Sequence, residues 1–210
     1  AGLAGAAFSL ALILAIGYRT GFLPARLLLA GVILAAAWGA VTTLLLALAP
    51  DAPLRGMVFW LMGDLAGATP GAIMPAGALA ALVLALPFGR PLDALARGDL
   101  AAASLGVAVT PVRTGVLCIC AAATAAVVVS AGSIGFVGLV TPHLVRLAGV
   151  RRHLLLLPAA ALAGAALLLL ADLAARTLVA PRQLPVGAIT ALVGAPLFLF
   201  LLVRSTPRPR

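Results

Sequence analysis

Long apolar runs separated by short polar intervals make up most of the chain. An apolar run of about 20 residues spans the roughly 30 Å hydrocarbon core of a bilayer when it is helical. Such runs, including one shorter segment at 134–147, occupy residues 1–17, 27–49, 70–89, 114–131, 134–147, 154–173 and 186–203. They predict an all-α polytopic membrane protein with about seven transmembrane helices, organised as a single transmembrane domain over residues 1–210.

A further apolar segment at 57–67 is too short to cross a bilayer and carries Asp64 close to Trp60. We predict that it forms one re-entrant or interfacial helix. A solvated helix end is the simplest interpretation of Asp64, and a contact at the outer mouth of a transport path is the alternative.

Composition agrees with the pattern. The 210 residues are 64% hydrophobic and 9% charged, with a mean hydropathy of +1.25. A soluble domain of this size has no core large enough to bury so much apolar surface. The net charge is +9 and the chain contains no Lys, which excludes a Walker A phosphate loop. This chain is therefore not expected to hydrolyse ATP by that route, and membrane topology explains its charge better than nucleic acid does.

The arginines predict the orientation of the helices, because cytoplasmic loops carry an excess of basic residues. Alternating crossings place eleven arginines on one side and three on the other, which makes the interval 90–113 and the C-terminus cytoplasmic. The larger group is Arg19, Arg26, Arg90, Arg97, Arg113, Arg146, Arg151, Arg152, Arg204, Arg208 and Arg210, and the smaller is Arg55, Arg176 and Arg182.

The interval 90–113 is the one polar stretch long enough to fold by itself. Pro91 suits the first position of a short helix, on which Asp93 and Arg97 stand four residues apart. Gly98 would end that helix. A helical pair with an unfilled apolar rim of Leu92, Leu95, Leu100 and Leu105 indicates a docking site for a soluble partner, although a plain connecting loop at the lipid interface remains the alternative.

A second short helix is expected directly after Gly98. Asp99 would cap its start, and Gly106 would end it after Ser104 and Leu105.

The short segment after residue 131 combines glycines with a proline and predicts a broken helix, which is tolerated where it is buried in protein or lines a water-filled path. The residues expected to shape the helix break, with glycines that allow close approach of neighbouring backbone, are Gly132, Gly135, Gly138, Pro142 and His143. His143 and Arg146 are expected on one face.

Catalytic and metal chemistry are poorly supported. Pairing of His143 with Asp172 is less plausible than a structural His143 and an ion pair between Asp172 and Arg176, four residues on. Cys118 and Cys120 point in different directions on a helix, so neither a metal site nor a disulfide is expected, and no cofactor is predicted.

Five stretches, in order, resemble the permease subunits of type II ABC importers, the FecCD family. They are Leu29-Ala-Gly-Val, Trp60-Leu-Met-Gly-Asp-Leu, the segment 92–106, Gly132 to Leu147, and the run from Ala171 to Phe198. The departures are Asp64, Ser133 and Thr141, which replace residues common in the family.

The resemblance implies a partial ten-helix permease, N-terminally truncated, that forms a homodimer in the bacterial inner membrane. It implies import of an iron–siderophore complex, haem or cobalamin, delivered by a periplasmic or lipid-anchored substrate-binding protein. A separate cytoplasmic ATPase subunit would bind two coupling helices, with contacts expected from Leu95, Arg97, Gly98, Asp99, Ala101, Ser104, Leu105 and Gly106. The alternative function is an ion-driven secondary transporter or channel, which the absence of charged residues at mid-span disfavours.

Overall fold

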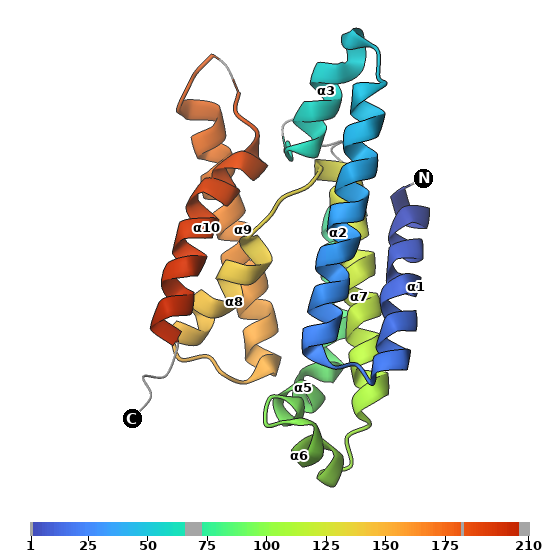
Figure 1. Ribbon diagram of the computed structural model, residues 1–210. Helices are drawn as coiled ribbons and strands as arrows, with labels where there is room; N and C mark the ends of the chain where they lie inside the picture. The colour runs from blue at the N-terminus through green and yellow to red at the C-terminus, as the bar shows by residue number, and fades with distance from the viewer. Residues whose placement is uncertain (1, 66–72, 182, 206–210) are drawn as a thin grey trace.

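The computed structural model describes residues 2–65, 73–181 and 183–205, and within these residues every regular element is a helix (Figure 1). The chain runs through α1 (Gly2–Thr20), α2 (Pro24–Ala47), α3 (Asp51–Leu61), α4 (Ile73–Ala85), the 3-10 turn η1 (Leu86–Phe88), α5 (Gly89–Leu95), α6 (Asp99–Ser104), α7 (Val109–Ala131), α8 (Val137–Leu147), α9 (His153–Thr177) and α10 (Val186–Ser205).

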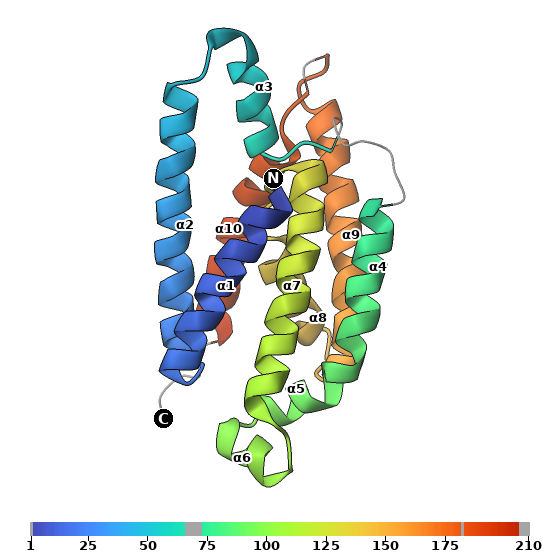
Figure 2. The same cartoon turned by 90° about the vertical axis from the view of Figure 1, so that its right-hand side faces the viewer.

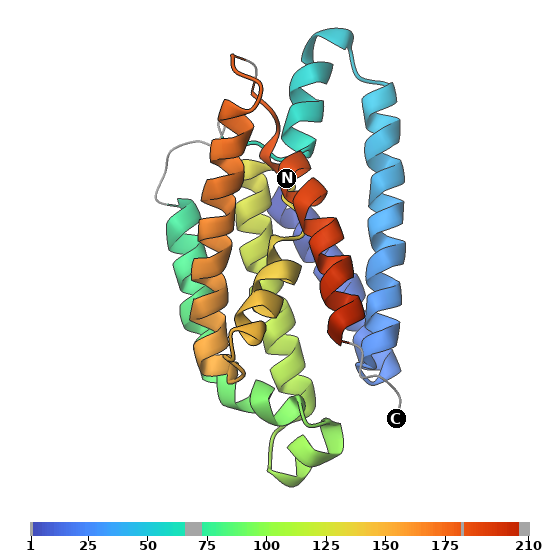
Figure 3. The ribbon, with the colours of Figure 1, turned by 90° about the vertical axis from the view of Figure 1, so that its left-hand side faces the viewer.

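The helices pack in two groups. In one group α7 contacts α1 and α4, and α1 also contacts α2. In the other, α9 packs against α8 and α10 (Figures 1 and 3). Contacts between α4 and α9 join the groups laterally, as Figure 2 shows.

Small residues allow this close packing. Among the described residues, seven of the thirteen buried hydrophobic side chains are alanines. Lipid removes the hydrophobic incentive for helices to associate, so close approach of their backbones has to supply the attraction. One such cluster, Ala171, Ala175 and Val186, lies between α9 and the start of α10.

Four helical stretches within the described residues are long and apolar enough to cross a membrane: Pro24–Ala47, Pro75–Leu95, Val109–Ala131 and His153–Thr177. Shorter apolar helices occupy Ala4–Thr20, Val137–Leu147 and Val186–Leu201. Each of the seven predicted apolar segments thus contains a helix, and crossing by the three shorter ones stays a prediction.

The predicted short helix at 57–67 begins earlier than expected. Helix α3 covers Asp51–Leu61, and residues 66 and 67 lie outside the described part of the chain. Pro50, in an extended conformation, ends the connection from α2 and starts α3. Helix α3 folds back beside the end of α2 and stops at the level where α7 ends (Figure 1).

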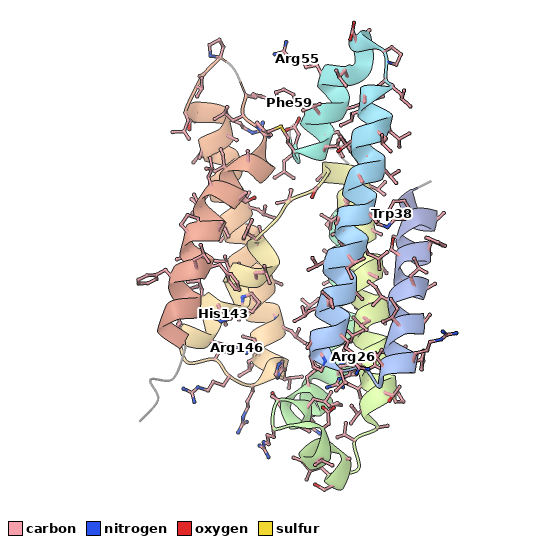
Figure 4. All side chains as sticks on the ribbon, viewed as in Figure 1. Arg26, Trp38, Arg55, Phe59, His143 and Arg146 are labelled. Atoms are coloured by element: carbon pink, nitrogen blue, oxygen red, sulfur yellow. The ribbon has the colours of Figure 1, made fainter. Side chains whose placement is uncertain are left out.

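Three arginines lie at the ends of the bundle to which the predicted sorting assigns them, and Arg182, Arg208 and Arg210 lie outside the described residues. Figure 4 shows Arg26 and Arg146 at the end that carries α5 and α6, and Arg55 at the opposite end with α3.

Three glycines hold the chain together at the α3 end, and we call this contact the glycine junction (Gly63, Gly132 and Gly187). A Cβ added to Gly132 would lie 2.0 Å from the Trp60 carbonyl oxygen, and one added to Gly187 would lie 2.0 Å from that of Met62. The Gly63 carbonyl accepts a hydrogen bond of 3.3 Å from the Gly187 amide. Backbone therefore lies directly against backbone where α3, α7 and α10 meet.

Two further backbone features fix this junction. Asp64, next to Gly63, donates its amide to the Ala131 carbonyl at 2.9 Å. Gly63 and Gly132 have φ values of +79° and +71°, which favour glycine. The expected close-approach role is confirmed at Gly132 but is wrong at Gly135 and Gly138, where an added Cβ meets no atom within 4 Å.

Gly187→Ala should destabilise the protein by about 3 kcal/mol or more, because its methyl group overlaps a backbone oxygen that cannot move independently. Thermal unfolding in detergent micelles measures this effect. Gly39→Ala is the matched control, since Gly39 also lies in a helix but has open space around its Cβ position. Equal melting temperatures for the two variants would contradict the geometry of the junction.

Candidate functional site

The segment 89–107, which we call the α5–α6 segment, forms the two short helices that the sequence predicts. Helix α5 begins at Gly89, and Pro91 occupies its third position, where a missing N–H still costs no helical hydrogen bond. Gly98 ends the turn after α5 with φ +107°, as predicted. The predicted loop was too long at its far end, because α7 already begins at Val109.

The predicted cap of the second helix is wrong. Gly98, and not Asp99, is the N-cap of α6, and no side chain caps this helix. The connection from α5 requires a positive φ at this position, which glycine adopts without strain. The Asp99 carboxylate lies in the first turn, where it complements the helix dipole.

Gly106 ends α6 as expected. The Val107 amide donates to the Ala102 carbonyl at 3.0 Å, and the Gly106 amide donates to that of Ala103 at 2.9 Å. With φ +78° at Gly106, these two bonds form a Schellman motif.

Arg113, in the second turn of α7, connects α6 to the turn between α1 and α2. Its Nη2 donates to Asp99 Oδ1 at 2.7 Å, and its Nη1 donates to the Phe22 carbonyl at 3.1 Å. The Arg113 side chain is 20% exposed and the Asp99 side chain 50%. The pair is therefore partly shielded from water and tied to backbone on its other side.

The acceptor turn is itself tightly built. Phe22 is 2% exposed, has φ +54°, and donates its amide to the Gly17 carbonyl at 2.9 Å. Its ring meets that of Tyr18 edge-on, with centroids 5.1 Å apart. An Ala at Gly17 would place a Cβ 2.7 Å from the Phe22 ring. The positive φ of Phe22 and the packing of its ring on Gly17 hold the Phe22 carbonyl in a defined position, where it accepts the hydrogen bond from Arg113.

Asp93, which stands four residues before Arg97, contacts His153. Asp93 Oδ1 lies 2.6 Å from His153 Nδ1 and accepts a hydrogen bond of 2.9 Å from the His153 amide. Both bonds cross from α5 to the first residue of α9. Gly89 is packed against the same place, with Leu154 backbone atoms 3.1–3.2 Å from its Cβ position. The α5–α6 segment is thus anchored to both helix groups: through Asp93 to α9, and through Asp99 to α7.

The outer face of the segment exposes apolar and polar side chains together. Leu100 is 90% exposed and Leu105 62%, whereas Leu92 and Leu95 are half-buried. The other predicted coupling residues are exposed at Arg97, Gly98, Asp99, Ser104 and Gly106, and half-buried at Ala101.

The chain breaks between α7 and α8, at residues 132–136, whereas the expected break residues Gly138, Pro142 and His143 lie inside the continuous helix α8. Gly132 ends α7 at φ +71°, an extended link crosses to the second helix group, and Phe136 at φ +66° is the N-cap of α8 (Figure 1). Pro142 lies inside α8 and leaves the Gly138 carbonyl without its helical donor. Figure 4 shows His143 and Arg146 on α8 toward the α5–α6 end.

His143 is half-buried and meets the Phe198 ring edge-on at 5.7 Å. This contact agrees with the structural role that the sequence favours. The expected ion pair between Asp172 and Arg176 is also confirmed, at 2.8 Å.

His143 and Arg97, predicted as members of two separate sites, line one cavity of about 860 Å³, which we call the basic pocket. Its remaining charged or titratable lining residues are Asp93, Arg146, Arg151, Arg152 and His153. The other predicted break residues, Gly132, Gly135, Gly138 and Pro142, do not line it.

Sequence reasoning missed Arg113, Phe22, His153 and Gly187 as structural partners of the site. The positive charge of Arg113 at the end of the polar interval 90–113 was the one available signal, and nothing local distinguishes the other three residues.

A family model described as the FecCD transport family matches residues 1–204. The chain belongs to this family.

Two curated FecCD relatives show the extent of the match. The chain is 44% identical over 183 residues to the hemin transport system permease protein HmuU of Yersinia pestis, covering 86% of this chain and 55% of the relative. It is 43% identical over 183 residues to the Fe(3+) dicitrate transport system permease protein FecD of Escherichia coli K12, covering 86% and 57%. The chain therefore spans a little over half the length of these relatives.

A solved structure, described as a metal-chelate type ABC transporter in an inward-facing conformation, has the same arrangement of helices. The TM-score is 0.84 at 33% identity, with 93% of this chain and 63% of that chain covered.

Arg113→Gln should speed hydrogen exchange of the α6 amides about fivefold, because a partly exposed ion pair stabilises by about 1 kcal/mol. Mass spectrometry of peptides covering residues 98–107 measures this rate. Arg176→Gln is the matched control, since it breaks an ion pair of similar length with Asp172 that lies on α9. Unchanged exchange in Arg113→Gln would show that Arg113 does not hold α6.

Proposed function

We propose that this chain is the membrane-spanning part of a permease subunit in an ATP-driven importer, and that the α5–α6 segment receives motion from a separate ATPase subunit. The observation that carries the proposal is the anchoring of this segment to both helix groups. A connecting loop would need neither link, whereas a transmitting element needs both.

The contact face fits a protein partner. Leu100, at 90% exposure, stands on a six-residue helix among polar neighbours such as Ser104 and Arg97. Apolar anchors surrounded by polar groups are typical of protein interfaces. The predicted coupling residues, from Leu95 to Gly106, supply this face.

The path for substrate belongs to the same proposal. The break at Gly132 lets the chain change helix group at membrane depth, and the half-helix α8 then presents Gly138 and Pro142. Two copies of the permease would enclose the path, and a substrate-binding protein would deliver substrate at the α3 end. The basic end of the bundle, with the C-terminus, would face the cytoplasm across the inner membrane.

The transported substrate is proposed from the relatives and the family resemblance. HmuU is described as a hemin permease and FecD as an Fe(3+) dicitrate permease. An iron chelate, haem or cobalamin is therefore the class of substrate to test.

A single Cys at Ser104 should cross-link to the co-expressed ATPase subunit, with a yield that changes when ATP is added. The experiment uses the full-length permease with Cys118 and Cys120 replaced. Ser104 is chosen because it is exposed, and a Cys at the half-buried Ala101 serves as a second position.

A Cys at Ala52 is the matched control, because Ala52 is also exposed but lies on α3 at the opposite end of the bundle. It should not cross-link to the ATPase subunit. Absence of a cross-link from both Ser104 and Ala101 would reduce the α5–α6 segment to a connector.

A further inference from the structure

The basic pocket holds far more positive than negative charge. Its described lining includes four arginines and two histidines against the single carboxylate of Asp93. The arginines and histidines come from three places in the chain: the turn after α5, helix α8, and the connection into α9 with its first residue. They are Arg97, His143, Arg146, Arg151, Arg152 and His153.

The one carboxylate is already engaged. Asp93 Oδ1 binds both the amide and the ring Nδ1 of His153. None of the ion pairs found among the described residues involves a pocket arginine, and Arg146 Nη2 lies 3.4 Å from the ring of His153. Asp93, which also interacts electrostatically with Arg152, is thus the single carboxylate in a lining with four arginines. This excess of positive charge favours binding of an anion.

The basic pocket lies next to exposed leucine side chains. Leu147, Leu154 and Leu155 beside it are 69%, 46% and 61% exposed. Leu154 and Leu155 lie in the first turn of the 25-residue apolar helix α9, and Arg151 and Arg152 immediately precede this helix. In a bilayer this places the arginines at the level of the lipid headgroups, with leucines below them in contact with the acyl chains.

We propose that the basic pocket binds a phosphate anion, presented by the headgroup of an anionic lipid at the α5–α6 end of the bundle. Guanidinium groups bind phosphate through paired hydrogen bonds, and basic pockets between transmembrane helices bind phosphate-bearing headgroups. Because Arg97 follows α5 and Arg146 lies on α8, one bound headgroup would join the α5–α6 segment to α8 and α9. The pocket shares Arg97 with the face proposed to contact the ATPase subunit, and its other basic lining residues lie outside that face.

The test compares lipid binding by the full-length permease and by two double variants. Arg151→Gln with Arg152→Gln removes two exposed pocket charges, and neither residue is placed in the coupling face. Arg19→Gln with Arg26→Gln is the matched control, because it removes two exposed charges beside the α1–α2 turn, outside the pocket lining. Native mass spectrometry in detergent measures retention of phosphatidylglycerol, with phosphatidylcholine as the neutral probe.

The pocket variant should retain phosphatidylglycerol about tenfold less well than the wild type, because it loses two of the four pocket arginines that would bind the phosphate. The control variant should bind it as the wild type does, and phosphatidylcholine binding should not change. Replacement of Arg151 and Arg152 by Lys should restore part of the affinity, which a folding defect would not allow.

Three results would overturn the proposal. Equal losses in the two Gln variants would show that overall charge, and not the pocket, attracts the lipid. Binding of inorganic phosphate with the affinity of the lipid would assign the site to a soluble phosphate instead. Release of the ATPase subunit from the pocket variant, with lipid retention unchanged, would assign the arginines to a protein contact.

Discussion

The backbone contact at the glycine junction is the constraint on which the arrangement of the helices depends. At this point the end of α3, the end of α7 and the start of α10 lie within backbone van der Waals distance. Side chains at Gly132 or Gly187 would place a Cβ 2.0 Å from a carbonyl oxygen, so the three segments could not meet. The link from α7 to α8 leaves from this junction, and it carries the chain from one helix group to the other.

The opposite end of the bundle is joined by side chains instead of backbone. Asp93 binds His153 at the start of α9, and Asp99 binds Arg113 on α7. The two helix groups are therefore connected at one end by a tight glycine contact and at the other by two polar links through short helices. In our account, a force on the α5–α6 segment changes the spacing of the groups at that end while the glycine junction remains closed.

The sequence predicted most of the elements because their signals are local. Apolar length located the helical segments, and the glycines at 98 and 106 located the ends of the short helices. The ion pair of Asp172 with Arg176 follows from a spacing of four residues on one helix. The break after α7 follows from Gly132, whereas Pro142 lies inside α8 and does not interrupt it.

The partners of the acidic residues in the α5–α6 segment could not be predicted in the same way. The sequence shows Arg97 four residues after Asp93, yet the partner of Asp93 is His153, 60 residues away in the chain. Asp99 was expected to cap a helix, but the N-cap position has a positive φ and is occupied by Gly98. The Asp99 carboxylate binds Arg113 instead. The close approach of Gly187 to Met62 likewise depends on how distant helices pack, which no local spacing encodes.

The most direct test of the account is a charge exchange between residues 99 and 113 in the full-length permease, reconstituted in proteoliposomes with its ATPase subunit and binding protein. ATP-driven uptake is measured with hemin, ferric dicitrate and cyanocobalamin as separate probes. The account predicts that Asp99→Arg and Arg113→Asp each reduce uptake of the transported probe about tenfold or more, and that the double exchange restores a large part of it. Wild-type uptake in both single variants would contradict transmission through this ion pair.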